Sequence, residues 1–261
     1  MSIKSELELA STKMIEEIND FVYKNKKVKL AALTEDNVAI VEAMIRNDSA
    51  YIKSSDINAC PSGKYGGSTA YWMTKLKEYL NSKVQNEDDY IKIITNAVNA
   101  VDRENRTHIN SDKCGRKEIS DRIIKMDKKD LLKSLQDPLY KNKLLYPSFE
   151  NMLLFNEIAR KTSAPKKARV NVSFGSKFCH YACYYLFEGQ DYQDNYSIYD
   201  YIVRTVLPWY LSYYKIEEKY DLEKYDEYRM AVDKIRERSS CSPISRNGFD
   251  HLLWYFHKGR L

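Results

Sequence analysis

The chain has 261 residues, of which 43% are hydrophobic and 30% are charged, and its formal net charge is +5 at pH 7. These proportions are ordinary for a globular protein, and the length suits one large domain or two small ones. No stretch approaches the roughly 20 apolar residues of a membrane span, and the first twenty residues are charged throughout, unlike a secretory signal. We therefore expect a cytoplasmic protein that binds no membrane.

Glycine and proline are scarce, with 8 and 6 residues, and β-branched runs are short, which together favour a mainly α fold. The five cysteines have irregular spacing, and no Cys or His pair at metal-ligand spacing accompanies them. We therefore expect buried free thiols, with no metal and no cofactor. The mildly basic charge permits nucleic-acid binding without requiring it.

Apolar residues recur at helical spacing in four segments of the first half of the chain. The second segment begins with an expected N-cap, Thr34, followed by two acidic residues that the helix dipole favours. Residues 54–68 are rich in Pro, Gly and Ser and predict a loop. Its Gly63–Ser68 part is similar in composition to a phosphate-binding loop but lacks the spacing of a P-loop. The expected helices are residues 1–30, 34–48, 69–80 and 88–101.

Residues 102–118 are the most polar part of the chain and predict an exposed connection. They indicate a division near residue 110, between an N-terminal helical region (1–110) and a second region (111–261). We expect Pro208 to kink or end its helix and Ser245 to cap the last one. The expected helices of this half are residues 127–135, one from Pro147 to about residue 159, residues 202–214, residues 216–238, and one after Ser245.

One segment of the second half carries residues suited to chemistry. Its first residues, Ser173–Ser176, predict a tight turn in which Gly175 takes a positive φ and Ser176 caps the next helix. N–H groups at such a turn and helix start suit a phosphate oxygen. Lys177 lies on a different stripe from the apolar face of that helix, so it could point into a cleft.

Asp200 opens the next apolar segment after a polar loop, and a chain that turns back there could bring it close to Lys177. The helix dipole would favour the ionised form of this carboxyl group. Taken singly, Lys177 could be a solvated surface residue and Asp200 an ordinary N-cap. The basic residues before the turn would add counter-charge for a nucleic-acid backbone, and they include Lys166, Lys167 and Arg169.

The order of turn, Lys, helix, loop and aliphatic–x–Asp resembles the helix-hairpin-helix DNA glycosylases, in particular the 8-oxoguanine glycosylase branch and a bacterial group similar to it. The matching motifs are SFxSK, here Ser173–Lys177, and IYD, here Ile198–Asp200. The likeness covers roughly residues 149–204 and the last aromatic helix. The chain departs from the family in having one glycine where the usual hairpin is rich in Gly and Pro, and it lacks the four-cysteine iron–sulfur signature of some relatives.

The resemblance implies a two-lobed helical glycosylase fold with a cleft between the lobes and no cofactor. It assigns the nucleophile to Lys177 and its electrostatic partner to Asp200. His180 could move a proton or be an ordinary packed neighbour, and Arg204 could contact a phosphate or form a surface ion pair. The implied partner is double-stranded DNA with a modified base flipped out of the duplex. The residues that would hold a phosphate are Ser173, Phe174, Gly175 and Ser176.

In the implied mechanism Lys177 attacks the anomeric carbon of the sugar and forms a Schiff base as the base leaves, after which β-elimination can cleave the strand. Ionised Asp200 stabilises the positive charge that develops on the sugar ring. The sequence does not identify the base. The candidates for its pocket lie on the last helix, at Phe249, His251 and Trp254.

Several functions remain open. The first is a DNA glycosylase with AP lyase activity in base excision repair. The second is a catalytically inactive DNA-binding protein of the same fold, such as a sensor in phage defence. The third is an unrelated helical interaction protein in which Lys177 is a surface residue and Asp200 a helix cap, and a hydrolase of small nucleosides is a fourth.

Overall fold

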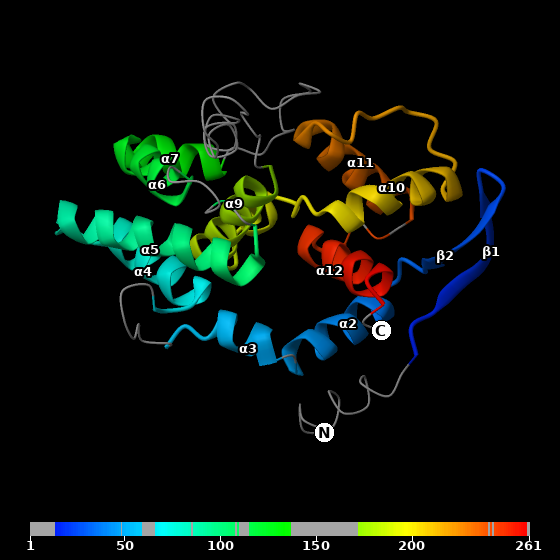
Figure 1. The fold of residues 1–261 in the computed structure, drawn as a ribbon, viewed down its shortest axis with the longest axis horizontal. Coiled ribbons are helices and arrows are strands. Elements are labelled where there is room, and N and C mark those ends of the chain that lie inside the picture. The colour runs from blue at the N-terminus through cyan, green and yellow to red at the C-terminus, as the bar shows by residue number, and fades with distance from the viewer. Residues whose placement is uncertain are drawn as a thin grey trace. The chain divides into compact units, whose positions relative to one another are not determined.

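The structure is a computed structural model, and its described residues are mainly helical, as expected, with one two-stranded sheet. These residues are 14–47, 49–58, 66–84, 86–107, 109, 115–136, 172–239, 241 and 243–259. The chain divides into two compact units: unit 1 is Met1–Asp48 with Tyr199–Leu261, and unit 2 is Ser49–Ile198 (Figure 1). The expected cleft of a two-lobed glycosylase stays a prediction.

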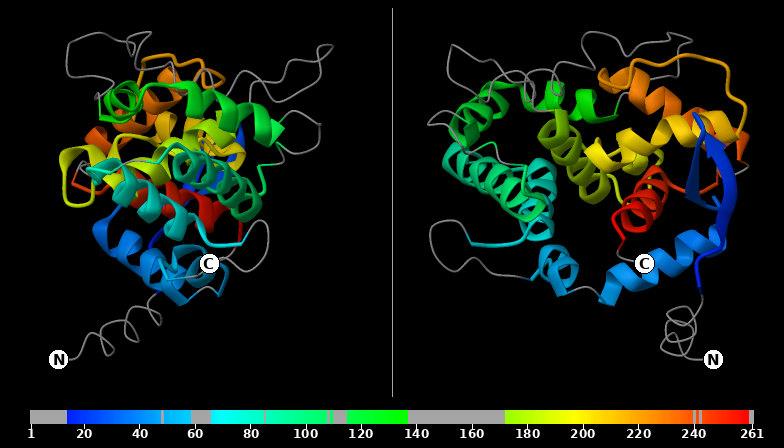
Figure 2. Two further views of the ribbon diagram at one scale, coloured as in Figure 1. Left: turned by 90° about the vertical axis from the view of Figure 1, so that its left-hand side faces the viewer. Right: turned by 45° about the vertical axis from the view of Figure 1, so that its right-hand side comes forward.

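Unit 1 combines a β-hairpin with helices from both ends of the chain. Its elements are β1 (Glu17–Tyr23), β2 (Lys26–Ala31), α2 (Glu35–Asn47), α10 (Tyr201–Tyr213), α11 (Tyr225–Arg238) and α12 (Arg246–His257). Helix α12 packs against α2 and α10, and the hairpin lies beside α10 (Figures 1 and 2). The core contains fully buried side chains from each part, such as Leu30, Tyr210, Val232 and Leu252.

The turn of the hairpin has an unusual backbone conformation. Its two residues, Lys24 and Asn25, have φ angles of 47° and 64°. Two left-handed residues make a turn whose twist matches that of the paired antiparallel strands, and Asn tolerates this conformation better than most residues. Because the turn contains no glycine, its residues are only a weak sequence signal for a hairpin.

The hairpin shows that the helix predicted for residues 1–30 is wrong from residue 17 onward. Phe21 is half-buried and makes an edge-to-face contact with Tyr213 of α10, with 5.3 Å between ring centroids. At the other end of the hairpin, Leu30 is fully buried. Packing of the strands against the rest of the unit therefore outweighs the local helical spacing. Residues 1–13 lie outside the described part of the chain.

Tyr210 connects the hairpin to the last helix. Its hydroxyl accepts a hydrogen bond from the N–H of Ala31 at 2.9 Å and lies 3.0 Å from Nε2 of His257. Burial lowers the pKa of His257 to about 4, so this imidazole is neutral near pH 7. Its Nε2 then accepts the hydroxyl proton, and both polar groups of the buried contact are satisfied.

Both N-caps expected in unit 1 are confirmed. Oγ1 of Thr34 accepts a hydrogen bond from Asn37 N–H at 3.2 Å, and Oγ of Ser245 accepts one from Gly248 N–H at 3.0 Å. Each cap satisfies an N–H group that has no partner inside its helix. Gly248 also permits close packing of α12 on α2, because a Cβ at this position would lie 2.9 Å from Cγ1 of Val38.

Helix α10 agrees with the helix expected over residues 202–214 and continues past Pro208 to Tyr213, so the helix does not end at that proline. One expected helix boundary in unit 1 was wrong. The helix expected over residues 216–238 begins only at Tyr225. Before it, the N–H of Asp221 donates to the Glu227 carboxylate at 2.6 Å, so an acid of the first turn binds the chain that precedes the helix.

Unit 2 is helical in its described residues. Its elements are α3 (Ser49–Ser55), α4 (Thr69–Asn81), α5 (Glu87–Asn105), α6 (Gly115–Lys125), α7 (Lys128–Gln136), α9 (Val172–Leu186) and the 3-10 helix η2 (Asp191–Asp194). Helices α4 and α5 pack on each other, α9 packs on both, and α6 lies along α5 (Figure 1). The helices expected at 69–80, 88–101 and 127–135 are confirmed, and the one expected from Pro147 lies outside the described residues.

The polar segment expected to be an exposed connection is partly buried. Helix α5 extends into it, and Asp102 is only 3% exposed. The carboxylate of Asp102 accepts hydrogen bonds from the Thr107 hydroxyl, from Ile109 N–H at 3.2 Å and from Nε of Arg116 at 2.7 Å. These bonds hold α6 against α5, and the boundary expected near residue 110 therefore lies inside unit 2.

Candidate functional site

The turn predicted at Ser173–Ser176 is wrong. These residues belong to helix α9, and Gly175 is not among the glycines with a positive φ. Ser176 is not a cap, because its hydroxyl bonds the Ser173 carbonyl one turn back at 3.2 Å. Phe174 is fully buried and stacks on Phe178 with 6.0 Å between centroids. Apolar packing one helical turn apart thus keeps this segment in a helix.

Lys177 is buried rather than solvated. It is 8% exposed, and its Nζ donates a hydrogen bond to the Ser173 hydroxyl at 3.2 Å. The interpretation of Lys177 as a solvated surface residue is therefore wrong. Lysine is seldom buried to this degree, because removing an ammonium group from water costs free energy.

His180 lies one helical turn after Lys177 and is 2% exposed. Its Nδ1 is 3.0 Å from the carbonyl oxygen of Tyr196. A carbonyl only accepts, so Nδ1 carries the proton in this contact. The ring also meets Tyr181 edge-on, with 5.3 Å between centroids. These contacts fit the interpretation of His180 as a packed neighbour, and its role in proton transfer stays a prediction.

Asp200 is the N-cap of α10, as its place at the start of an apolar segment indicated. Its carboxylate accepts a hydrogen bond from the N–H of Ile202 at 2.8 Å. A backbone hydrogen bond also joins Asp200 to the hydroxyl of Tyr228, which is fully buried. Because Asp200 belongs to unit 1 and Lys177 to unit 2, the approach of the two groups stays a prediction.

Arg204 has partners within unit 1. Its Nη1 donates to the Tyr199 hydroxyl at 2.9 Å, and it forms an ion pair with Glu223. Its guanidinium also lies over the ring of Tyr201, at 5.4 Å from the centroid. This arrangement fits the surface ion pair rather than the phosphate contact. The other cations expected to contact DNA, Lys166, Lys167 and Arg169, lie outside the described residues.

The three candidates for a base pocket differ in burial. Phe249 is 1% exposed and belongs to the hydrophobic core of unit 1, which leaves it a packing role. His251 and Trp254 are half-buried. Nζ of Lys258 lies 4.0 Å from the centroid of the Trp254 ring, a cation–π contact. A base pocket in this helix stays a prediction.

A charged cluster between α11 and α12 was not identified from the sequence. Arg246 donates two hydrogen bonds to the Asp233 carboxylate, at 2.8 and 2.9 Å, and Nε of Arg236 donates to the Ile244 carbonyl at 3.0 Å. Burial acts to raise the pKa of Asp233, but Arg246, Arg229 and Arg236 outweigh it and the pKa is lowered. The spacing of Arg229, Asp233 and Arg236 along one helical face was a signal for this cluster.

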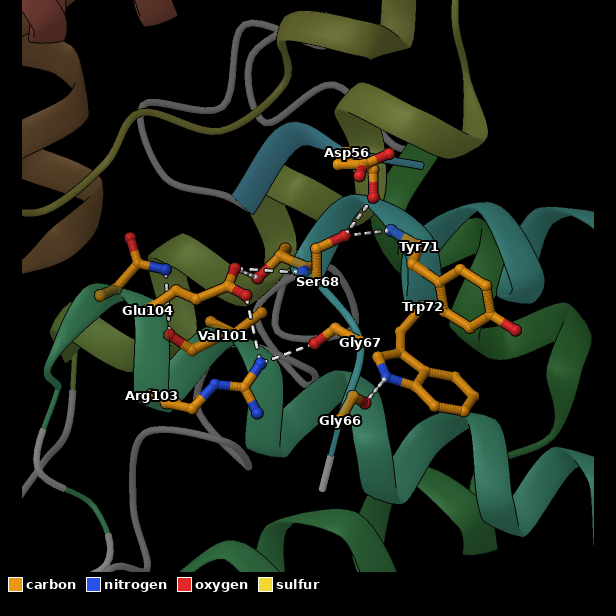
Figure 3. A network of polar contacts seen from close by, with 11 residues as sticks. Asp56, Gly66, Gly67, Ser68, Tyr71, Trp72, Val101, Arg103 and Glu104 are labelled. Carbon is orange, nitrogen blue, oxygen red and sulfur yellow. Dashed lines mark hydrogen bonds and ion pairs between the residues drawn. The ribbon is translucent and has the colours of Figure 1, made fainter. Parts of the chain in front are cut away.

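A polar network in unit 2 holds the end of the loop at residues 54–68, whose glycine-rich part was compared with a phosphate-binding loop (Figure 3). Glu104 of α5 accepts hydrogen bonds from both the N–H and the hydroxyl of Thr69, at the start of α4. Burial raises the pKa of Glu104, against the lowering effect of these bonds. A carboxylate therefore occupies the place that a phosphate would take at this helix start.

Gly67 is required by this network. Its φ is 92°, and an added Cβ would lie 2.5 Å from Nε1 of Trp72. That indole nitrogen donates to the Gly66 carbonyl at 2.8 Å, and Nη2 of Arg103 donates to the Gly67 carbonyl at 2.6 Å (Figure 3). Residues 59–65 of the loop lie outside the described part of the chain.

A groove of about 780 Å³ lies in unit 1 and contains none of the candidate residues. It is lined by the segment after α10 and the end of α11, where Lys234 pairs with Glu218 at 3.6 Å and with Glu237 at 3.9 Å. In the described residues, no three His, Cys, Asp or Glu side chains come together as metal ligands. No described helix is long and apolar enough to span a bilayer.

Comparisons with protein-family models, with characterised proteins and with solved structures found no match to this chain. The resemblance to glycosylases therefore rests on the residues of the Ser173–Lys177 and Ile198–Asp200 motifs alone.

Proposed function

We propose that this protein is a DNA glycosylase with AP lyase activity, in which Lys177 is the nucleophile. The burial of this lysine in α9, where its Nζ donates a hydrogen bond to the Ser173 hydroxyl at 3.2 Å, is the observation that supports the proposal. A nucleophilic amine must be neutral when it attacks, and removal from water disfavours the charged form of amines in general.

In the proposed reaction, a modified base leaves the duplex and enters the protein. The lone pair of Nζ bonds to C1′ of the deoxyribose, and the bond between C1′ and the base breaks with its electrons passing to the base, which takes up a proton. Opening of the sugar ring then gives a Schiff base, and loss of the C2′ proton expels the 3′ phosphate.

Asp200 has a supporting role in this proposal. Its carboxylate is oriented by the Ile202 N–H, and it would stabilise the positive charge that develops on the sugar. The backbone hydrogen bond to Tyr228 keeps the first turn of α10 in place within unit 1.

Borohydride trapping tests the proposal directly. Incubation with duplexes that carry an abasic site, oxidised bases or bulky phage-type bases should give a covalent adduct, and Lys177→Ala should abolish it. Lys77→Ala is the control, because Lys77 is ion-paired with Glu188 at the surface and should leave trapping unchanged. An adduct that persists in Lys177→Ala contradicts the assigned nucleophile, and no adduct on any substrate contradicts the glycosylase.

A second candidate is a DNA-binding protein without chemistry. The formal charge of +6 on residues 49–198 favours it, because positive charge attracts DNA whether or not a base is removed. Salt-dependent duplex binding by a protein that never forms an adduct would support this second function over the first.

A further inference from the structure

Three lysines on α6 and α7 are exposed and carry unneutralised charge. We call Lys125, Lys129 and Lys133 the α6–α7 lysines. All three are exposed, and no residue that the structure describes forms an ion pair with them. Three other lysines of unit 2 are neutralised within the protein: Lys75 by Glu78 at 2.6 Å, Lys77 by Glu188 at 3.2 Å and Lys117 by Asp121 at 2.6 Å. Three more are exposed without an ion pair to a described residue, but they are spread over the unit rather than gathered on two consecutive helices: Lys53, Lys83 and Lys92.

The charge of the chain is concentrated in the same unit. Residues 49–198 hold 24 of the 42 Lys and Arg residues and 18 of the 37 Asp and Glu residues, so unit 2 carries +6 and unit 1 carries −1. An unneutralised positive surface on the positive unit is where a polyanion would be attracted most strongly.

The N-terminal end of α7 is held by Lys128, whose charge is not available to a ligand. Its Nζ donates to the Tyr79 hydroxyl at 2.8 Å and lies over the rings of Tyr79 and Tyr90, at 4.7 and 5.2 Å from their centroids. Lys128 and Lys129 are thus adjacent in sequence but different in role, because one binds α4 and α5 while the other faces solvent.

The C-terminal end of α7 is connected to α9 and to the segment after η2. Asn195 donates to the Leu135 carbonyl and the Tyr196 hydroxyl donates to the Ser134 carbonyl, both at 2.8 Å. The Cys183 thiol of α9 also points at the Leu135 carbonyl, at 3.4 Å. The α6–α7 lysines are therefore fixed on the same unit as the helix of Lys177.

The acidic residues among these lysines serve the helix itself. Asp127 accepts a hydrogen bond from the Lys129 N–H at 2.7 Å, and Asp130 lies in the first turn of α7. Both positions are where the helix dipole favours a carboxylate. No residue of α6 or α7 is among the large hydrophobic side chains exposed on the described surface, so the face lacks the apolar residues that bind a lipid bilayer.

We propose that the phosphodiester backbone of duplex DNA binds along the α6–α7 lysines. The inference rests on the proposed function and adds the surface by which the duplex is held while a base reaches Lys177. Each lysine that contacts a phosphate releases condensed counterions, which makes binding depend on salt.

Salt titrations of duplex binding test this surface with a matched control. The triple variant K125Q/K129Q/K133Q and the control triple K53Q/K83Q/K92Q, whose lysines are exposed but lie outside α6 and α7, each lower the formal net charge from +5 to +2. The slope of log K against log salt should fall by up to about 2.7 in the first triple, at about 0.9 for each lost phosphate contact, and by less than about 1 in the control. Equal changes in both triples would overturn the inference, and so would a wild-type protein that binds no duplex at low salt.

A charge-conserving variant distinguishes the loss of positive charge from a loss of structure. K125R/K129R/K133R should bind with the wild-type slope, and a loss equal to that of the Gln triple would overturn the inference. If circular dichroism shows that the Gln triple is unfolded, the salt slopes of the single variants K129Q and K133Q test the inference instead. Each should fall by about 0.9.

Trapping separates this inference from the proposed function. Adduct formation with unchanged slopes in every variant would contradict the surface and leave the glycosylase in place. Duplex binding through this surface without any adduct would contradict the glycosylase and leave the surface in place.

Discussion

Two groups of charged side chains, one in each unit of this protein, are used in opposite ways. In unit 1, α11 and α12 turn their charges inward, where Arg246 binds Asp233 through two hydrogen bonds. In unit 2, Lys125, Lys129 and Lys133 keep their charges in water with no described partner. Removing one partner of a buried ion pair leaves the other charge buried and unpaired and so destabilises the fold, whereas an exposed and unneutralised charge is available to a ligand. The comparison therefore separates residues that we expect to affect stability from residues that we expect to affect binding.

The largest effect should come from breaking the inward pairing of unit 1. The Asp233 carboxylate is largely buried, and Arg246→Ala removes the two hydrogen bonds that it accepts from Arg246. We expect the free energy of unfolding to fall by about 3 kcal/mol. Urea denaturation measures this loss. Lys129→Ala in unit 2 is the control, and a loss as large in that variant would contradict the division between the units.

Backbone geometry in unit 2 should give the next largest effect. Gly67→Ala combines a φ of 92° with a Cβ only 2.5 Å from Nε1 of Trp72, and we expect a loss of about 2 kcal/mol or more. Gly189→Ala has a comparable φ of 74° but no atom within 4 Å of the added Cβ, so only the backbone strain of about 1 kcal/mol remains. Thermal denaturation compares the two, and equal losses would show that the contact with Trp72 is unimportant.

The helix caps offer a smaller test within each unit. Ser245→Ala removes the hydrogen bond to Gly248 N–H and should cost about 1 kcal/mol. Ser68→Ala removes a similar cap bond to Tyr71 N–H and also the bond from the hydroxyl to the Asp56 carbonyl at 2.6 Å, so the loss should be larger. A smaller loss in Ser68→Ala would contradict the additional role of that hydroxyl.

The pH dependence of stability should differ in sign between the units. The folded pKa of Asp233 is lowered from 3.8, so its contribution is present above that pH and is lost as pH falls through the folded value. The folded pKa of Glu104 is raised from 4.5, so the folded state binds the extra proton and stability falls as pH rises from 4.5 to the folded value.

Melting curves between pH 3 and about 6 would measure both effects, which we expect to be the smallest of these predictions. Asp233→Asn should flatten the rise of stability with pH, and Glu104→Gln should remove the opposing fall. The same change of slope in both variants would contradict the opposite shifts of the two carboxyl groups.

Sequence patterns predicted correctly the helices that begin with an N-cap residue followed by an apolar run. Thr34 and Ser245 were recognised as N-caps because a hydroxyl before an apolar run satisfies a donor within the same few residues, and the structure confirms both bonds. The hairpin at residues 17–31 was missed because its turn, Lys24–Asn25, contains no glycine and its strands are held by α10.

The candidate site was predicted in part. Asp200 was expected at a helix start and is an N-cap, whereas Ser173–Ser176 were expected in a turn and are helical. Gly175 suggested the turn by its conformational freedom, but the packing of Phe174 on Phe178 favours the helix instead. A local pattern cannot register such packing, because the energy comes from side chains buried by the surrounding elements.

The sequence alone determined the mainly helical class, the helix starts capped by Thr34 and Ser245, and the net positive charge of the chain, because each depends on residue type and near neighbours. Only the tertiary structure decided that Lys177 is buried, that Asp102 and Glu104 hold their unit together, and that Lys129 is exposed while Lys128 is not. Burial and pairing arise between residues far apart in the chain, and the free energy of a charged group depends on them more than on its neighbours in sequence.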